Sequence, residues 1–180
     1  MDKRSRSLLV IAAVVAVVAI IAVVAIVVTG GDSDDVDVVV APTLTGEDYA
    51  GNSVTVAPGE DGPLMLVFLA HWCPHCNAEI PVLQEWEASG AIPEDLSIVG
   101  ISTAVAPDQP NYPPDQWLTD MGWTWPVLAD DEVGTFAEQY GVTGFPYLVF
   151  IGADGAVTAT ESGELPISRL QELADQAVAA

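Results

Sequence analysis

The feature that most constrains the fold is a six-residue apolar run followed at once by the start of a helix. Residues 64–69 read Leu-Met-Leu-Val-Phe-Leu, an unbroken run typical of a central strand buried on both faces. Proline is favoured at the first position of a helix, so Pro74 predicts a helix over residues 74–89. Apolar residues recur in this segment at helical spacing: Ile80, Leu83 and Trp86. A buried strand leading directly into a helix indicates an α/β fold.

The rest of the chain alternates strand-like and helix-like segments. β-prone runs at 38–40 and 53–56 flank a turn-rich stretch around Gly46 and Gly51-Asn52 and predict a β-hairpin. Further strands are expected at residues 96–101, 126–128, 147–151 and 157–160. Further helices are expected at residues 114–121, at residues 132–140 and from Pro166 onward. This order predicts an α/β sandwich in which helices flank a central mixed β-sheet.

An apolar segment from Leu8 to Val28 precedes this domain. It has 21 residues without a charge or a proline, and as a helix it would be roughly 32 Å long, enough to cross a membrane. The alternative is a cleaved secretory signal, whose apolar core has only about 7–15 residues. We expect an uncleaved transmembrane anchor at residues 8–28, an acidic linker at 29–37 and a domain at 38–180.

Charge is distributed unequally on the two sides of this segment. Three of the four basic residues precede it, and all but one of the 26 acidic residues follow it. Because positive residues stay on the cytoplasmic side of a membrane, residues 1–7 are expected in the cytoplasm and the domain outside it. The net charge of −22 excludes nucleic acid as a partner, since no set of cations is available for phosphates. We interpret the acidic surface as a solvated one, with adaptation to high salt as the alternative.

The only two cysteines, Cys73 and Cys76, lie within four residues of each other. A disulfide in so short a loop constrains little of the unfolded chain, so the pair is interpreted as reactive rather than structural. Cys73 is expected at the N-cap, where unpaired amides favour the thiolate, and Cys76 one turn deeper. This arrangement is the one that thiol–disulfide exchange requires. A protonated His75 would stabilise the thiolate further and make the pair more oxidising.

Four segments of the sequence carry a resemblance to a known family: residues 41–46, residues 66–76 with Pro81, residues 126–130 and residues 140–146. From about residue 41 to residue 178 the chain resembles the TlpA/ResA-like branch of the thioredoxin superfamily, whose members are membrane-tethered and work outside the cytoplasm. The resemblance implies disulfide exchange with exported proteins or apocytochrome c, without a cofactor. It also implies a membrane redox partner that recycles the cysteine pair.

The resemblance also assigns residues to the site. It implies that Pro146 is a cis-proline facing the cysteines and that the backbone of Phe145 pairs with an extended substrate segment. Trp72 is expected to shield the disulfide and to border the substrate groove together with Pro74. The dipeptide Pro74-His75 is similar to that of the periplasmic oxidant DsbA and favours oxidation. The family branch instead favours reduction or cytochrome c maturation, so both directions of electron flow stay open.

The chain departs from the family in the strand that precedes the cysteines. Many relatives hold an acidic residue there, which shuttles a proton for the buried cysteine, but this chain has only apolar residues at 66–68. The candidate bases are therefore Glu60, Asp61, Glu79 or a water molecule.

Two other functions would suit parts of this sequence. His71, Cys73, His75 and Cys76 are soft ligands that suit copper or zinc, but His75 is expected to point away from the two sulfurs. A peroxiredoxin-like peroxidase would suit the fold, but Ala70 stands where its threonine is expected. The expected mechanism is nucleophilic exchange, in which Cys73 attacks a substrate disulfide and Cys76 resolves the mixed disulfide.

Overall fold

The protein is represented by a computed structural model that describes residues 39–180. The expected anchor at 8–28 and the linker at 29–37 lie outside the described residues. Within residues 39–180, no helix combines the length and the apolar character that a membrane crossing requires.

The described residues form one seven-stranded sheet with helices. The elements are β1 (Leu44–Glu47), β2 (Ser53–Val56), β3 (Leu64–Leu69), α2 (Pro74–Ala88), β4 (Ser97–Ser102), α3 (Pro114–Asp120), β5 (Val127–Ala129), α4 (Thr135–Gln139), β6 (Tyr147–Ile151), β7 (Val157–Ser162) and α5 (Ile167–Ala179). The strand order is β2-β1-β5-β4-β3-β6-β7. β3 pairs parallel with β4 and antiparallel with β6, which confirms the expected mixed sheet.

β3 is the central buried strand that the sequence predicts, and all six of its residues are buried. Met65, Val67 and Leu69 pack into the cluster formed with α2, α3 and α5. The alternate residues, including Leu66 and Phe68, pack on the other face with β1, β2 and α4. Burying each such side chain contributes about 1.5–3 kcal/mol, so β3 anchors both layers.

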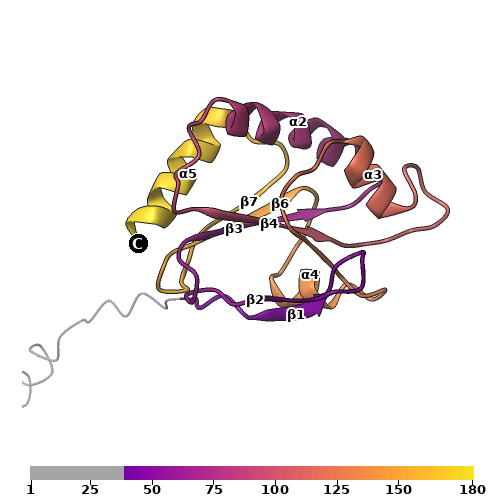
Figure 1. The fold of residues 1–180 in the computed structure, drawn as a ribbon, viewed down its shortest axis with the longest axis horizontal. Coiled ribbons are helices and arrows are strands. Elements are labelled where there is room, and N and C mark those ends of the chain that lie inside the picture. The colour runs from indigo at the N-terminus through magenta and orange to yellow at the C-terminus, as the bar shows by residue number, and fades with distance from the viewer. Residues whose placement is uncertain (1–38) are drawn as a thin grey trace, which may run out of the picture. The chain divides into compact units, whose positions relative to one another are not determined.

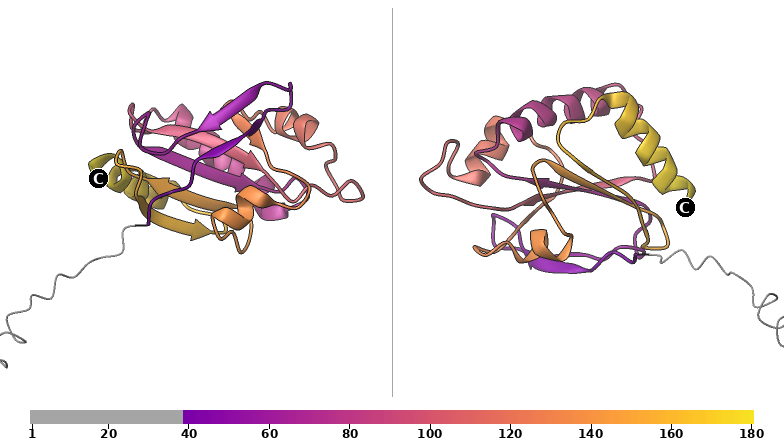
Figure 2. Two further views of the ribbon diagram at one scale, coloured as in Figure 1. Left: turned by 90° about the horizontal axis from the view of Figure 1, so that it is seen from below. Right: turned by 180° about the vertical axis from the view of Figure 1, so that it is seen from behind.

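The layers are visible in the ribbon views. Figure 1 shows α2, α3 and α5 on one side of the strands, and α4 with the β1–β2 hairpin on the other. The same layering appears from behind in Figure 2. Since α2 follows β3 directly, its N-terminus lies at the edge of the sheet where the parallel strands β3 and β4 end. This edge carries the two cysteines.

The predicted hairpin was wrong in one of its strands. β2 pairs with residues 44–47, whereas Val40 forms only an isolated bridge with Ala156. The stretch around Gly46 is strand rather than turn: Gly46 pairs with Val54 of β2, and the side chains of Leu128 and Phe136 come to 3.1 Å from the position that a Cβ would take at Gly46. Tertiary packing thus overrides the local turn propensity.

The helix predicted at 132–140 begins later, at Thr135. The carboxylate of Asp131 accepts hydrogen bonds from the backbone of Val133 and Thr135 and stabilises a turn over these residues. The buried Asp130 accepts hydrogen bonds from the backbone N–H groups of Phe136 and Ala137 at 2.8 and 3.1 Å. These bonds fix the start of α4. The predictions for the helices α2, α3 and α5 are confirmed within two residues.

Candidate active site

The two sulfurs lie at the first turn of α2, where the sequence predicts them. Cys73 is the N-cap residue and Cys76 lies three residues further along the helix. Both are free thiols. Cys73 is 5 % exposed and Cys76 is fully buried, so only Cys73 offers a sulfur to a molecule in solution.

The Cys73 thiol interacts with the loop before β6 rather than with its own helix. No side-chain hydrogen bond caps α2, which corrects the expectation that the sulfur faces the first amides of the helix. The thiol instead donates to the carbonyl oxygen of Phe145, at a distance of 3.4 Å between Sγ and O. The Phe145–Pro146 bond is cis, as the resemblance implies, and Pro146 is buried. The backbone before β6 therefore faces the reactive sulfur.

Trp72 and Phe145 flank the cysteine. Their rings form an edge-to-face pair with centroids 6.0 Å apart, and both residues are half-buried. Trp72 Nε1 donates a hydrogen bond of 2.8 Å to the carbonyl oxygen of Ala104, which fixes the indole against the loop after β4. Pro74 is exposed beside Cys73. These residues therefore lie around Cys73, and their role in binding a substrate stays a prediction.

His71 is a buried loop anchor. Its Nδ1 lies 2.7 Å from the carbonyl oxygen of Pro110, and its Nε2 accepts the backbone N–H of Ala106 at 3.1 Å. This pair of bonds requires a neutral imidazole with its proton on Nδ1. With both nitrogens occupied, His71 has no lone pair left for a metal ion. No cluster of three or more metal-binding side chains occurs among residues 39–180.

Glu79 is a fully buried carboxyl on the same face of α2 as Cys76. Its Oε2 accepts the backbone N–H of Leu165 at 2.9 Å, whereas Oε1 has no hydrogen-bond partner. Burial raises the pKa of Glu79 to about 7, and the negative charge of Glu164 contributes in the same direction. A carboxyl with this pKa can both accept and return a proton near neutral pH.

Cys76 is held as a protonated thiol. Burial is the main cause that raises its pKa well above the ordinary value, and the nearby charges of Cys73 and Glu79 add to the effect. Cys76 therefore needs a base before it can attack, because the thiolate is the nucleophile. Glu79 is one helical turn away and titrates near neutrality, which makes it the base that this geometry supports.

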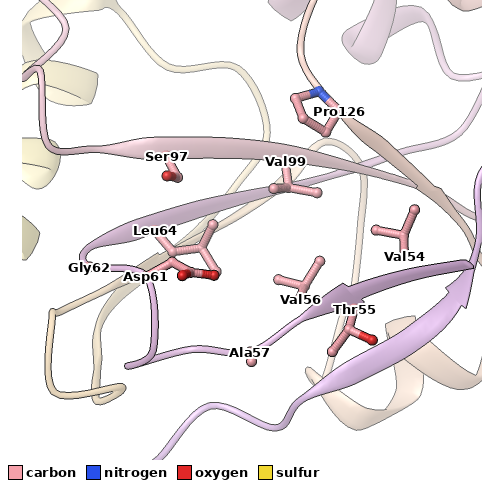
Figure 3. A pocket seen from close by; sticks show the side chains of 10 residues that line it. All are labelled: Val54, Thr55, Val56, Ala57, Asp61, Gly62, Leu64, Ser97, Val99 and Pro126. Atoms are coloured by element: carbon pink, nitrogen blue, oxygen red, sulfur yellow. The ribbon is translucent and has the colours of Figure 1, made fainter.

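The other candidate bases lie at the far end of the strand. Glu60 and Asp61 precede β3, whereas Cys73 follows it, and a six-residue strand spans roughly 20 Å. Asp61 lines a cavity of about 270 Å³ together with Leu64 and Ser97 at the start of β3 and β4 (Figure 3). The cysteines do not line this cavity, so it is separate from the site.

His75 is an exposed member of the site. Its Nδ1 lies 2.7 Å from Oε1 of Glu164, and the two side chains are 65 % and 48 % exposed. The imidazole therefore interacts with a carboxylate, a contact that the sequence analysis did not anticipate. The tuning of the Cys73 thiolate by His75 stays a prediction.

Sequence reasoning found most of the site but missed Glu164. Glu79 carried a signal, because a residue three positions after Cys76 lies on the same inward face of a helix. Glu164 is 89 residues from His75 in a loop, and no local pattern in the sequence marks it.

Comparison with known proteins gives several relatives that are named for thiol–disulfide exchange. The thiol:disulfide interchange protein DsbE of Vibrio cholerae is 30% identical over 110 residues, which cover 61% of this chain and 55% of that protein. The thiol-disulfide oxidoreductase ResA of Oceanobacillus iheyensis is 28% identical over 125 residues, covering 69% of this chain and 62% of that protein. The chain thus spans a little over half the length of these curated relatives.

Solved structures support the fold. A thioredoxin family protein from Chlorobium tepidum has a TM-score of 0.64 at 24% identity, covering 80% of this chain and 99% of that one. StoA from Bacillus subtilis has a TM-score of 0.60 at 18% identity, covering 74% of this chain and 97% of that one. These similarities show a thioredoxin-like α/β fold. The family model described as AhpC/TSA matches residues 39–160, more than half of the sequence, and the chain belongs to the AhpC/TSA family.

Proposed function

We propose that this chain is a thiol–disulfide oxidoreductase that exchanges disulfides with protein substrates through Cys73 and Cys76. One observation carries the proposal: a slightly exposed thiol and a fully buried thiol share the first turn of α2. The relatives named as thiol:disulfide interchange proteins support the same activity.

The reduction of a substrate proceeds in two exchanges. The Cys73 thiolate attacks one sulfur of a substrate disulfide, a Cys73–substrate bond forms, and the other substrate sulfur leaves as a thiolate. Cys76 then loses its proton to Glu79 and attacks the Cys73 sulfur. The second substrate thiolate leaves, so the substrate gains two electrons and Cys73–Cys76 becomes a disulfide. The reverse steps oxidise a substrate dithiol, and the redox partner that resets the pair sets the direction.

The surroundings of Cys73 suit an extended protein segment. The Phe145 carbonyl lies 3.4 Å from the sulfur in the free protein, and a substrate backbone N–H can take over this acceptor. The rings of Trp72 and Phe145 pack against each other beside Cys73, and the exposed Pro74 follows it directly, so these apolar side chains are the proposed contacts of the substrate segment. Protein thiols and disulfides, including those of exported proteins and apocytochrome c, are the proposed substrates.

The proposed location is the outer side of the cell membrane. The length of the apolar segment at 8–28 and the basic residues before it support a single-pass anchor with a cytoplasmic N-terminus. Such a tether keeps the domain at high local concentration near a membrane redox partner. Protease added to intact spheroplasts is expected to remove the domain while residues 1–7 remain protected; a fully protected domain would contradict this topology.

Trapping of intermediates tests the activity. In Cys76→Ser, the mixed disulfide between Cys73 and a substrate cannot be resolved, so it is expected to accumulate on non-reducing gels. Cys73→Ser is the matched control and is expected to form little adduct, because Cys76 is buried. Equal adducts in both variants, or none in either, would contradict the assigned roles.

A further inference from the structure

Positive charge is scarce around the site. Among residues 39–180, Arg169 is the one Lys or Arg, and its guanidinium binds Glu161 at 2.7 Å and Glu172 at 2.8 Å. His71 uses both ring nitrogens for backbone hydrogen bonds. His75 is therefore the side chain of this part of the chain that can bring a positive charge to the site, where it contacts the carboxylate of Glu164.

Three successive residues after β7 connect the separate parts of the site. The backbone N–H of Gly163 donates to the carbonyl oxygen of Pro146 at 2.8 Å. The carboxylate of Glu164 binds Nδ1 of His75 at 2.7 Å. The backbone N–H of Leu165 donates to Oε2 of the buried Glu79 at 2.9 Å. The segment 163–165 thus joins an exposed imidazole to a buried carboxyl.

We propose that the His75–Glu164 pair controls proton exchange between Glu79 and Cys76 by neutralising the charge of Glu164 and holding Leu165 on Glu79. His75 and Glu164 are then positioning residues that act through this segment. The proposal rests on the proposed function, because it concerns the step in which Cys76 loses its proton.

The sign of each effect follows from the charges. The negative charge of Glu164 and burial both raise the pKa of Glu79, whereas the Leu165 N–H lowers it. Loss of the His75 charge leaves Glu164 uncompensated and raises the pKa of Glu79 further. Loss of the Glu164 charge lowers it. The other titratable group facing Glu79 is Cys76 on its own helix.

Glutamine variants in the full chain separate these effects. His75→Gln keeps a hydrogen-bond donor and Glu164→Gln keeps an acceptor, so each substitution removes mainly a charge. The protonation of Glu79 is followed by infrared difference spectroscopy, with Glu79→Gln identifying the band, and the rate of Cys76-dependent resolution is followed over the same pH range. Glu85→Gln, on the exposed face of α2, is the control and is expected to shift neither curve.

The two single variants are expected to shift the Glu79 midpoint in opposite directions. His75→Gln moves it up and Glu164→Gln moves it down, each by about half a pH unit, and the resolution curve shifts with it. In the double variant, replacement of His75 is expected to have no further effect.

Either of two results would overturn the proposal. The first is that His75→Gln leaves the Glu79 midpoint unchanged. The second is that His75→Gln shifts the Glu79 midpoint as much in the Glu164→Gln variant as in the wild type, which would mean that His75 does not act through Glu164 but acts directly on Cys73. The infrared midpoint needs no turnover, so it is informative even if the chain exchanges no disulfides, a failure that the trapping experiment reports separately.

Discussion

Ionisation of the buried Glu79 is expected to cost the folded protein stability. Burial raises the pKa of Glu79 from 4.5 to about 7. Between these two values the unfolded chain has already lost the proton that the folded protein still binds, so stability falls as the pH rises through this window. This difference in pKa lowers the free energy of unfolding by at most about 3 kcal/mol above pH 7, and by almost nothing at pH 4.

The neutral variant Glu79→Gln removes this loss. Its unfolding free energy minus that of the wild type is expected to rise by about 3 kcal/mol between pH 4 and pH 8. Urea unfolding of the full chain in mild detergent, followed by tryptophan fluorescence, measures the difference at each pH. Taking the difference between the two proteins cancels the pH dependence that arises from the many other carboxylates.

Glu85→Gln is the matched control for this measurement. It removes the same charge from an exposed position of the same helix, so its difference from the wild type is expected to change little with pH. If Glu79→Gln behaves like Glu85→Gln, then Glu79 ionises without penalty. It would then not be the base with a raised pKa that the mechanism requires.

Three further substitutions test the packing around the site. Gly100→Ala places a Cβ 2.8 Å from Cζ2 of Trp123, so urea unfolding is expected to show a loss of about 1–3 kcal/mol; unchanged stability would refute the close packing. His71→Leu removes the side chain that binds the Pro110 carbonyl and the Ala106 N–H, so limited proteolysis is expected to cut the loop at 104–113 sooner, and an unchanged rate would contradict its anchoring role. Trp72→Phe keeps a ring but loses the hydrogen bond to Ala104, at a cost of about 1 kcal/mol in the same unfolding assay; no loss would mean that this bond is not formed in solution.

The central part of the fold was predictable because its signals are local. The unbroken apolar run of β3 and the helical spacing of Ile80, Leu83 and Trp86 specify burial without knowledge of the rest of the chain. The hairpin was misplaced in its first strand only, and the packing around Gly46 in that strand involves side chains about 80 and 90 residues further along the chain, Leu128 and Phe136. Local sequence propensity contains no information about such contacts between distant residues.

In the site, too, some features have a local signal in the sequence and others depend on the tertiary fold. The position of the sulfurs follows from motif spacing, the role of the proline before β6 was implied by the family resemblance alone, and the inward position of Glu79 follows from its place one turn after Cys76. The partner of His75 does not, because Glu164 lies in a loop after β7 that only the tertiary fold brings to α2. His71 has a role that sequence reasoning did not find, since its hydrogen-bond partners lie in a loop 35 and 39 residues away.

The redox chemistry of the two sulfurs is tested most directly by equilibrating the full chain in two sets of buffers, one with graded ratios of reduced to oxidised glutathione and one with graded ratios of reduced to oxidised dithiothreitol, so that both oxidising and reducing pairs are covered. Alkylation followed by mass spectrometry counts the free thiols at each ratio. We expect a single two-electron transition in which the number of free thiols falls from two to none. For such a transition, the ratio of oxidised to reduced protein changes tenfold for about every 30 mV of buffer potential. A Cys73–Cys76 exchange site would be contradicted if both thiols stay free at every ratio, or if only one of the two thiols is lost.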